Sequence, residues 1–137
     1  MGQAFPTPAV HGPDGWPLSG ATFGSADHYA RAVGLLHRNP DAALDALCLA
    51  LRLSPAFVMA RVAMAYLLAW DEPAMGRATV RGLMPHDRTA REASHLAMLS
   101  AAGPGGPDAA ALRAHLDTWP DDILARALQA QSAARAA

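Results

Sequence analysis

Residues 39–55 read NPDAALDALCLALRLSP, and this stretch decides the fold class. Asn39 followed by Pro40 is typical of a helix start, because asparagine caps the first turn and proline lacks an N–H that would be unsatisfied there. The apolar residues that follow recur every three or four positions, which places them on one face of a helix. They are Ala43, Leu44, Leu47, Ala50 and Leu51. The stretch therefore predicts an amphipathic helix that ends near Leu53.

Similar start signals recur along the chain and predict an all-α fold. Seven helices are expected, over about 25–38, 39–53, 54–70, 71–84, 88–101, 108–118 and 120–137. Ser54 with Pro55 is expected to begin the third, and Thr89 with Glu92 predicts a capping box at the fifth. Short connections leave consecutive helices antiparallel, packed as hairpins. The helical domain is expected to cover 25–137.

Residues 1–24 differ from the rest because prolines and glycines alternate there without a helical period. They predict an extended N-terminal arm. Its apolar side chains can lie along a groove of the helices, with Trp16 expected to anchor it.

Composition narrows the functional classes. The 137 residues fit one domain; 52% are hydrophobic and only 6% aromatic. The 11 basic residues are all arginine, are scattered, and nearly balance 12 acidic ones, so neither nucleic acid nor an anionic membrane is expected as a partner. No apolar run reaches the ~20 residues that span a bilayer, and no leader pattern begins the chain, so a cytoplasmic location is expected. Arginine without lysine and abundant alanine are typical of a GC-rich bacterial genome.

Cys48 is the single cysteine, so it forms no internal disulfide and no thiol-based zinc site. It lies within an apolar helix and is expected to be a buried, inert thiol.

The helix pairs recur every thirty-odd residues, which favours a tetratricopeptide-like repeat. In such repeats small residues lie where helices cross, a bulky apolar residue lies beside them, and proline closes the second helix. Ala43, Leu47, Ala50 and Pro55 keep this order and spacing. Leu112 and Pro120 repeat part of it. We therefore expect a short α-solenoid.

Four short strings, taken together and in this order, give a closer resemblance. They are Asp14, Gly15, Pro17, Leu18, Ser19; Pro55, Phe57, Val58, Met59; Arg91, Glu92, His95; and Pro120, Asp122, Leu124, Ala125. Over about 14–128 the chain resembles the N-terminal part of the tetratricopeptide repeat protein 38 family. That resemblance implies an α-solenoid and supplies no catalytic activity. Family members continue for several more helical pairs, and their polar segment with a histidine is replaced here by Ala127, Gln129 and Ala130, so the chain is either a short relative or a fragment.

The most suggestive polar set is Arg91, Glu92 and His95, because Glu92 and His95 share one helix face. The spacing is not that of a zinc protease, and three protein ligands are normally needed. A structural role is favoured, with Glu92 capping its helix and His95 bonding across a hairpin. No catalytic, cofactor-binding or metal-binding residue is predicted. The histidines near loops, His11, His86 and His115, are expected to be solvated.

The sequence thus favours a non-enzymatic helical repeat module that presents a concave surface to a protein, a peptide or its own arm. The candidate binding surface consists of Tyr29, Tyr66, Trp70, Arg91, Glu92 and His95. One alternative is a small-ligand-binding protein or metal-dependent enzyme that uses Glu92 and His95, with His28 or Tyr66. Another is an incomplete piece of a longer solenoid. Ile123, Leu124 and Leu128 of the last helix must pack on the sixth helix or on a second copy, so a homodimer through that helix is also expected.

Overall fold

The computed structural model describes residues 9–83, 88–103 and 106–136, and within these ranges the chain is helical with no β-strand. The elements are α1 (Phe23–Leu35), α2 (Pro40–Leu53), α3 (Val58–Ala69), α4 (Pro73–Val80), a 3₁₀ turn η1 (Arg81–Leu83), α5 (Ala90–Ala101), α6 (Ala109–Thr118) and α7 (Ile123–Ala136). The predicted all-α fold with seven helices is therefore confirmed.

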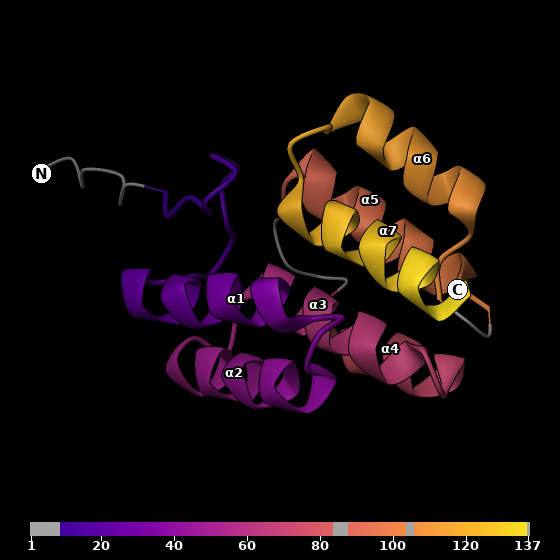
Figure 1. The fold of residues 1–137 in the computed structure, drawn as a ribbon. Helices are drawn as coiled ribbons and strands as arrows, with labels where there is room; N and C mark the ends of the chain where they lie inside the picture. Colours follow the sequence, from indigo (N-terminus) through magenta and orange to yellow (C-terminus); the bar gives the residue numbers. More distant parts are fainter. Residues whose placement is uncertain (1–8, 84–87, 104–105, 137) are drawn as a thin grey trace, which may run out of the picture.

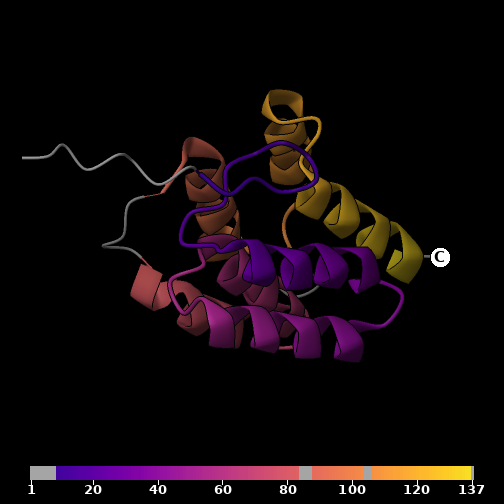
Figure 2. The ribbon, with the colours of Figure 1, turned by 90° about the vertical axis from the view of Figure 1, so that its left-hand side faces the viewer.

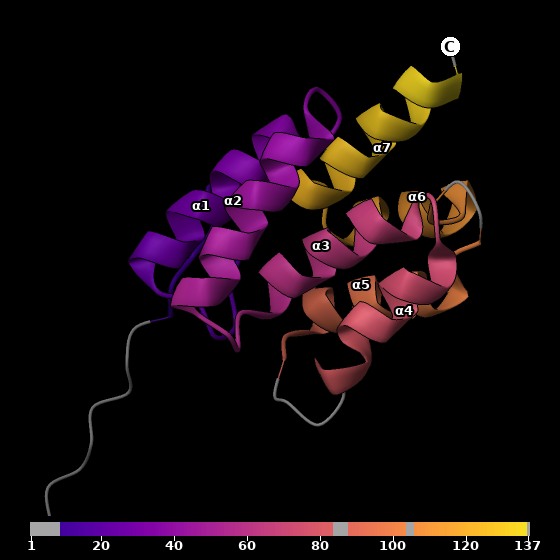
Figure 3. The ribbon, with the colours of Figure 1, turned by 90° about the horizontal axis from the view of Figure 1, so that it is seen from below.

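The helices form two layers (Figure 1). One contains α1 with α2 and α3 with α4, each pair an antiparallel hairpin, and the view from below shows these pairs side by side (Figure 3). The other contains α5, α6 and α7. Helix α3 packs against α5, while α7 packs against both α6 and α1. The last helix therefore returns to the first.

Side-chain caps explain where several helices begin. Asn39 caps α2, Asp108 caps α6, and Thr89 with Glu92 forms the predicted capping box of α5. Helix α1 begins at Phe23, two residues before the predicted start, because Thr22 is its cap and Ser25 is the third residue of that capping box.

The third helix begins at Val58, later than the predicted start at Ser54. The Ser54 hydroxyl donates a hydrogen bond to Ser25 Oγ at 2.8 Å, so it joins the start of α1 and does not cap α3. Ser54 thus closes α2 and links the first two helices.

The core contains the small and bulky residues that the repeat pattern predicts at helix crossings. Ala43, Leu47 and Ala50 are fully buried. Cys48 is exposed, so the expectation of a buried thiol was wrong. One position after Leu47 is about 100° further round the helix, which moves Cys48 off the apolar stripe.

The described part of the arm folds back on itself as a short loop. The N–H of Leu18 donates to the Val10 carbonyl at 2.8 Å, and the N–H of Gly12 donates to the Trp16 carbonyl at 2.9 Å. Leu18 is the buried side chain, whereas Trp16 is half-buried. Leu18 is therefore more deeply buried than Trp16, the residue that the sequence predicts as the anchor.

This arm connects the starts of three helices. The Ser19 carbonyl accepts from the N–H of Val58 at 3.0 Å, and the Asp14 carboxylate accepts from the N–H of Ile123 at 3.1 Å. Ser19 also donates to Glu92 through its N–H at 3.0 Å and its hydroxyl at 2.6 Å. Figure 2 shows the indigo loop of the arm at the end of the molecule where α7 begins. The arm thus holds the first turns of α3, α5 and α7 together.

The backbone at Gly20 explains how the arm approaches so closely. Its φ is +80°, and a Cβ there would collide with the Ala56 carbonyl. Only glycine fits this position without rearrangement.

Leu124 and Leu128 of α7 are fully buried within the chain, and Ile123 is half-buried. The apolar face proposed for a homodimer is thus largely covered by the protein itself. Among the described helices, none is long and apolar enough to cross a bilayer.

Gly76→Ala should destabilise the fold by about 1–3 kcal/mol, because the new Cβ would collide with Ala69 and lie 2.7 Å from the Ala65 carbonyl oxygen. Urea unfolding measures the change. Gly34→Ala is the matched control, since nothing lies within 4 Å of that Cβ, and it should raise stability by up to about 1 kcal/mol. Equal effects of the two substitutions would show that α3 and α4 do not cross as closely as described.

Candidate functional site

The Asp122 carboxylate lies fully buried at the start of α7 and accepts hydrogen bonds from three helices, α5, α6 and α7. Its Oδ1 accepts from the backbone N–H groups of Leu124 at 3.0 Å and Ala125 at 3.1 Å, which caps α7. Its Oδ2 lies 2.7 Å from Nε2 of His95 on α5 and 2.8 Å from Nε2 of His115 on α6.

Arg91, also on α5, balances the charge of this carboxylate. Its Nη1 lies 3.2 Å from Asp122 Oδ2, and both side chains are buried. Its Nη2 donates to the Pro17 carbonyl of the arm at 3.5 Å. Burial alone would raise the pKa of Asp122, but hydrogen bonds from His115 and His95, together with the positive charge of Arg91, hold that pKa well below its usual range. Asp122 is therefore ionised at neutral pH.

An ionised carboxylate only accepts hydrogen bonds, so each histidine must donate to it through Nε2–H. Burial lowers the pKa of His95, and hydrogen bonding and attraction to Asp122 only partly offset this effect. His95 is therefore neutral at neutral pH and carries its proton on Nε2. Its Nδ1 is left as an acceptor.

Two hydroxyl groups complete the network. Tyr66 Oη lies 2.8 Å from His95 Nδ1, and Ser94 Oγ lies 2.8 Å from His115 Nδ1. Burial raises the pKa of Tyr66, so its hydroxyl remains protonated and donates. Two chains of hydrogen bonds thus meet at Asp122: one from Tyr66 through His95, the other from Ser94 through His115.

The residues predicted as a binding surface lie mainly in the interior. Tyr29, Tyr66, Arg91, Glu92 and His95 are all buried, so they form no exposed surface in this structure.

Glu92 has the structural role that the sequence favours. It accepts from the N–H of Thr89 at 2.8 Å and from Ser19, so its carboxylate is engaged on both sides. Glu92 caps α5 while His95 faces Asp122, and no hydrogen bond among the described residues links His28 to either. Of the other residues in the enzyme alternative, Tyr66 is the one that the described hydrogen bonds join to His95, with its hydroxyl 2.8 Å from Nδ1.

Trp70 lies outside this network and is half-buried. The Arg135 guanidinium lies 4.1 Å from the centroid of its ring. Gly106 also packs closely on this indole, since a Cβ at Gly106 would lie only 2.9 Å from the Trp70 ring. Trp70 therefore connects the end of α3 to the end of α7.

Sequence reasoning missed Ser94, His115 and Asp122. His115 was expected to be solvated, but it is 3% exposed; His86 lies outside the described residues. One sequence signal could have predicted this contact. His115 and Asp122 are seven residues apart on either side of the short turn between α6 and α7, and such a turn brings the two side chains together.

His95, His115 and Asp122 could also supply three metal ligands, since their ligand atoms all lie within 4.8 Å of one another. Two features favour direct hydrogen bonding among these residues over metal coordination. The N···O separations of 2.7 and 2.8 Å are those of direct hydrogen bonds, and the Arg91 guanidinium already places a positive charge beside the same oxygen.

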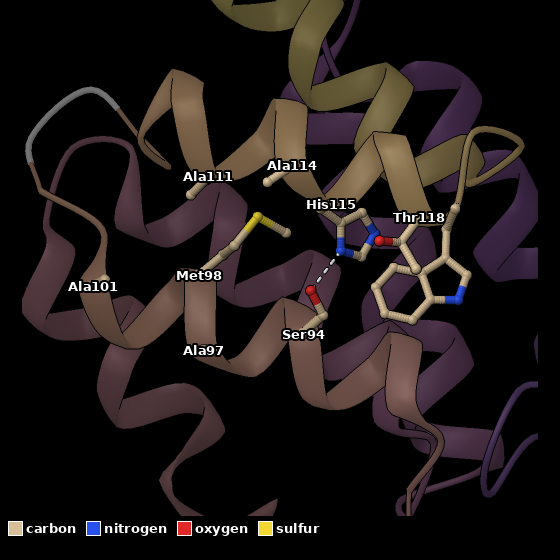
Figure 4. Close-up of a pocket in the computed structure, with 9 residues that line it drawn as sticks. Ser94, Ala97, Met98, Ala101, Ala111, Ala114, His115 and Thr118 are labelled. Atoms are coloured by element: carbon tan, nitrogen blue, oxygen red, sulfur yellow. Dashed lines mark hydrogen bonds between the residues drawn. The ribbon is translucent and has the colours of Figure 1, made fainter.

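An open pocket of about 350 Å³ lies between α5 and α6, against the edge of this network. Its wall is mostly apolar and is formed by Ala97, Met98, Ala101, Ala111, Ala114 and Trp119, with Ser94, His115 and Thr118 at one end. Figure 4 shows Met98 between the two helices and the hydrogen bond from Ser94 to His115. Ser94 is half-exposed, so this end of the network is open to ligands.

Comparisons with protein-family models, with curated proteins and with solved structures each found no match. The resemblance to the tetratricopeptide repeat protein 38 family therefore stays a prediction from the sequence.

Asp122→Asn should lower the free energy of unfolding by about 3–5 kcal/mol, because it leaves the buried Arg91 guanidinium without its negative partner. Urea unfolding of the full chain measures this change. Asp121→Asn is the matched control: Asp121 is exposed, so its substitution should change stability by less than about 0.5 kcal/mol. A similar small effect at both positions would contradict the central role of Asp122.

Acidification should destabilise the fold in two stages. The folded-state pKa values of His95 and Asp122 are both lowered, so the unfolded chain binds more protons and stability falls with falling pH. The loss begins below the ordinary histidine value of 6.5 and continues below the ordinary aspartate value of 3.8. Unfolding measured between about pH 8 and 3 should show both stages. His95→Gln should flatten the first stage, and an unchanged slope would contradict this assignment.

Proposed function

We propose that the chain is a tetratricopeptide-like helical module that binds a protein or peptide by taking up an apolar side chain between α5 and α6. The open pocket between these helices carries the proposal. Its alanines leave room between the two backbones, while Met98 and Trp119 supply polarizable surface. Such a wall suits an aliphatic or aromatic side chain.

The helical hairpins support a repeat-like arrangement. Helices α1 with α2 and α3 with α4 form two hairpins that contact each other through α2 and α3, and this contact supports the proposal. The packing of α7 on α1 departs from a simple solenoid, in which each repeat contacts only its neighbours. The described part of the arm contacts helix starts and does not line the pocket, which leaves the pocket open to a separate chain.

The position of the pocket predicts how a partner binds. A peptide that lies across α5 and α6 would place one apolar residue beside Met98, with polar neighbours near Ser94 and Thr118. Peptides selected from a randomised display library on the full chain should therefore share one apolar anchor residue.

Ala114→Leu should weaken the binding of such a selected peptide at least about tenfold, because the added atoms occupy the space of the anchor. Fluorescence anisotropy with a labelled peptide measures the affinity. Ala130→Leu, at an exposed position on α7 that does not line the pocket, is the control and should bind normally. Selection of no peptide, or equal binding to both variants, would contradict the proposal.

A further inference from the structure

We propose that Ser94, His115 and Asp122 form a nucleophilic site for acyl transfer, and that its substrate is an activated ester or thioester with a short apolar acyl group. The three side chains stand in the relation that such a site needs. Ser94 Oγ lies 2.8 Å from His115 Nδ1, and His115 Nε2 lies 2.8 Å from Asp122 Oδ2.

Each member has a distinct role. Asp122 is fixed by the first turn of α7 and holds the Nε2–H of His115, which leaves Nδ1 as the base facing Ser94. The carboxylate also stabilises the imidazolium that forms when His115 takes up a proton. His115 is further held between the rings of His95, at a centroid distance of 4.3 Å, and Trp119, at 4.8 Å.

Access distinguishes Ser94 from Tyr66, the other hydroxyl of the network. Tyr66 is buried, whereas Ser94 is half-exposed and lines the pocket beside His115. Figure 4 shows the Ser94 hydroxyl directed at the His115 ring at the end of the pocket. An acyl group bound against Met98 would thus lie beside the Ser94 hydroxyl, which is hydrogen-bonded to its base, His115.

The reaction balances with water as the second reactant. Ser94 Oγ forms a bond to the carbonyl carbon as its proton passes to His115 Nδ1, and the same proton then passes to the leaving oxygen or sulfur as its bond to carbon breaks. Water next attacks the acyl carbon and gives a proton to His115, which returns it to Ser94 Oγ as the acyl bond breaks. The products are a carboxylic acid and an alcohol or thiol.

The substrate class follows from the location of Ser94. It lies inside α5, where its backbone N–H is committed to the helix and gives no hydrogen bond to a carbonyl oxyanion. Substrates with a good leaving group depend least on such donors. The pocket volume of about 350 Å³ and its apolar wall favour a short aliphatic acyl chain.

The test uses the full chain with 4-nitrophenyl butyrate and with a fluorophosphonate probe. We expect mass spectrometry to locate the phosphonate on Ser94. Ser94→Ala should lose this adduct and reduce ester hydrolysis at least about tenfold, with His115→Gln doing the same. Ser100→Ala, at an exposed serine on the same helix, should keep both the adduct and the rate.

Circular dichroism and urea unfolding establish that the variants are folded. A folded Ser94→Ala variant that hydrolyses the ester at the original rate would overturn the proposal, as would labelling of Ser94 that persists undiminished in folded His115→Gln. The inference needs no peptide partner. Ser94→Ala keeps the apolar wall, so retained peptide binding with lost acylation separates this proposal from the binding function.

Discussion

One buried carboxylate fixes the second layer of the molecule. An aspartate without partners would be costly in the interior, so Asp122 is stable there only while α5, α6 and α7 supply hydrogen-bond donors or positive charge. Helix α5 supplies His95 and Arg91, α6 supplies His115, and α7 supplies two backbone N–H groups. A shift of any of these helices would leave a charge or a donor unsatisfied. Their relative positions are therefore more restricted than apolar packing alone would make them.

The hydrogen-bond network around the same carboxylate also connects the two layers and the arm. Tyr66 of α3 reaches the network through His95, and Arg91 reaches the arm through the Pro17 carbonyl. Buried ion pairs add little net stability over apolar packing, but they discriminate among alternative packings, because most alternatives would leave the charge unpaired. In this protein the polar network joins α3, α5, α6, α7 and the arm, while buried alanines contribute to the apolar core.

Local patterns were enough to predict the helices, whereas the site depends on contacts between distant residues. Asn39 and the pair Thr89 and Glu92 cap helices by bonding within three residues, so their spacing carries the information. Ser54 looked like a cap, but its hydroxyl bonds to Ser25, which is 29 residues away. His115 was expected to be solvated, because helix position alone does not determine which neighbour covers a side chain. Cys48 was expected to be buried, although its position one residue after Leu47 lies off the apolar stripe. Asp122 was read only as part of a resemblance, since its partners lie on other helices.

The arm has a consequence for the order in which the molecule is assembled. Asp14 bonds to Ile123 across 109 residues of chain, and Ser19 bonds to Glu92 across 73. Loops of that length close slowly, so hairpins of neighbouring helices should form first and these contacts late. During synthesis the arm emerges from the ribosome before the helices whose first turns it holds. Its contact with the start of α7 can therefore form only after almost all of the described chain has been synthesised.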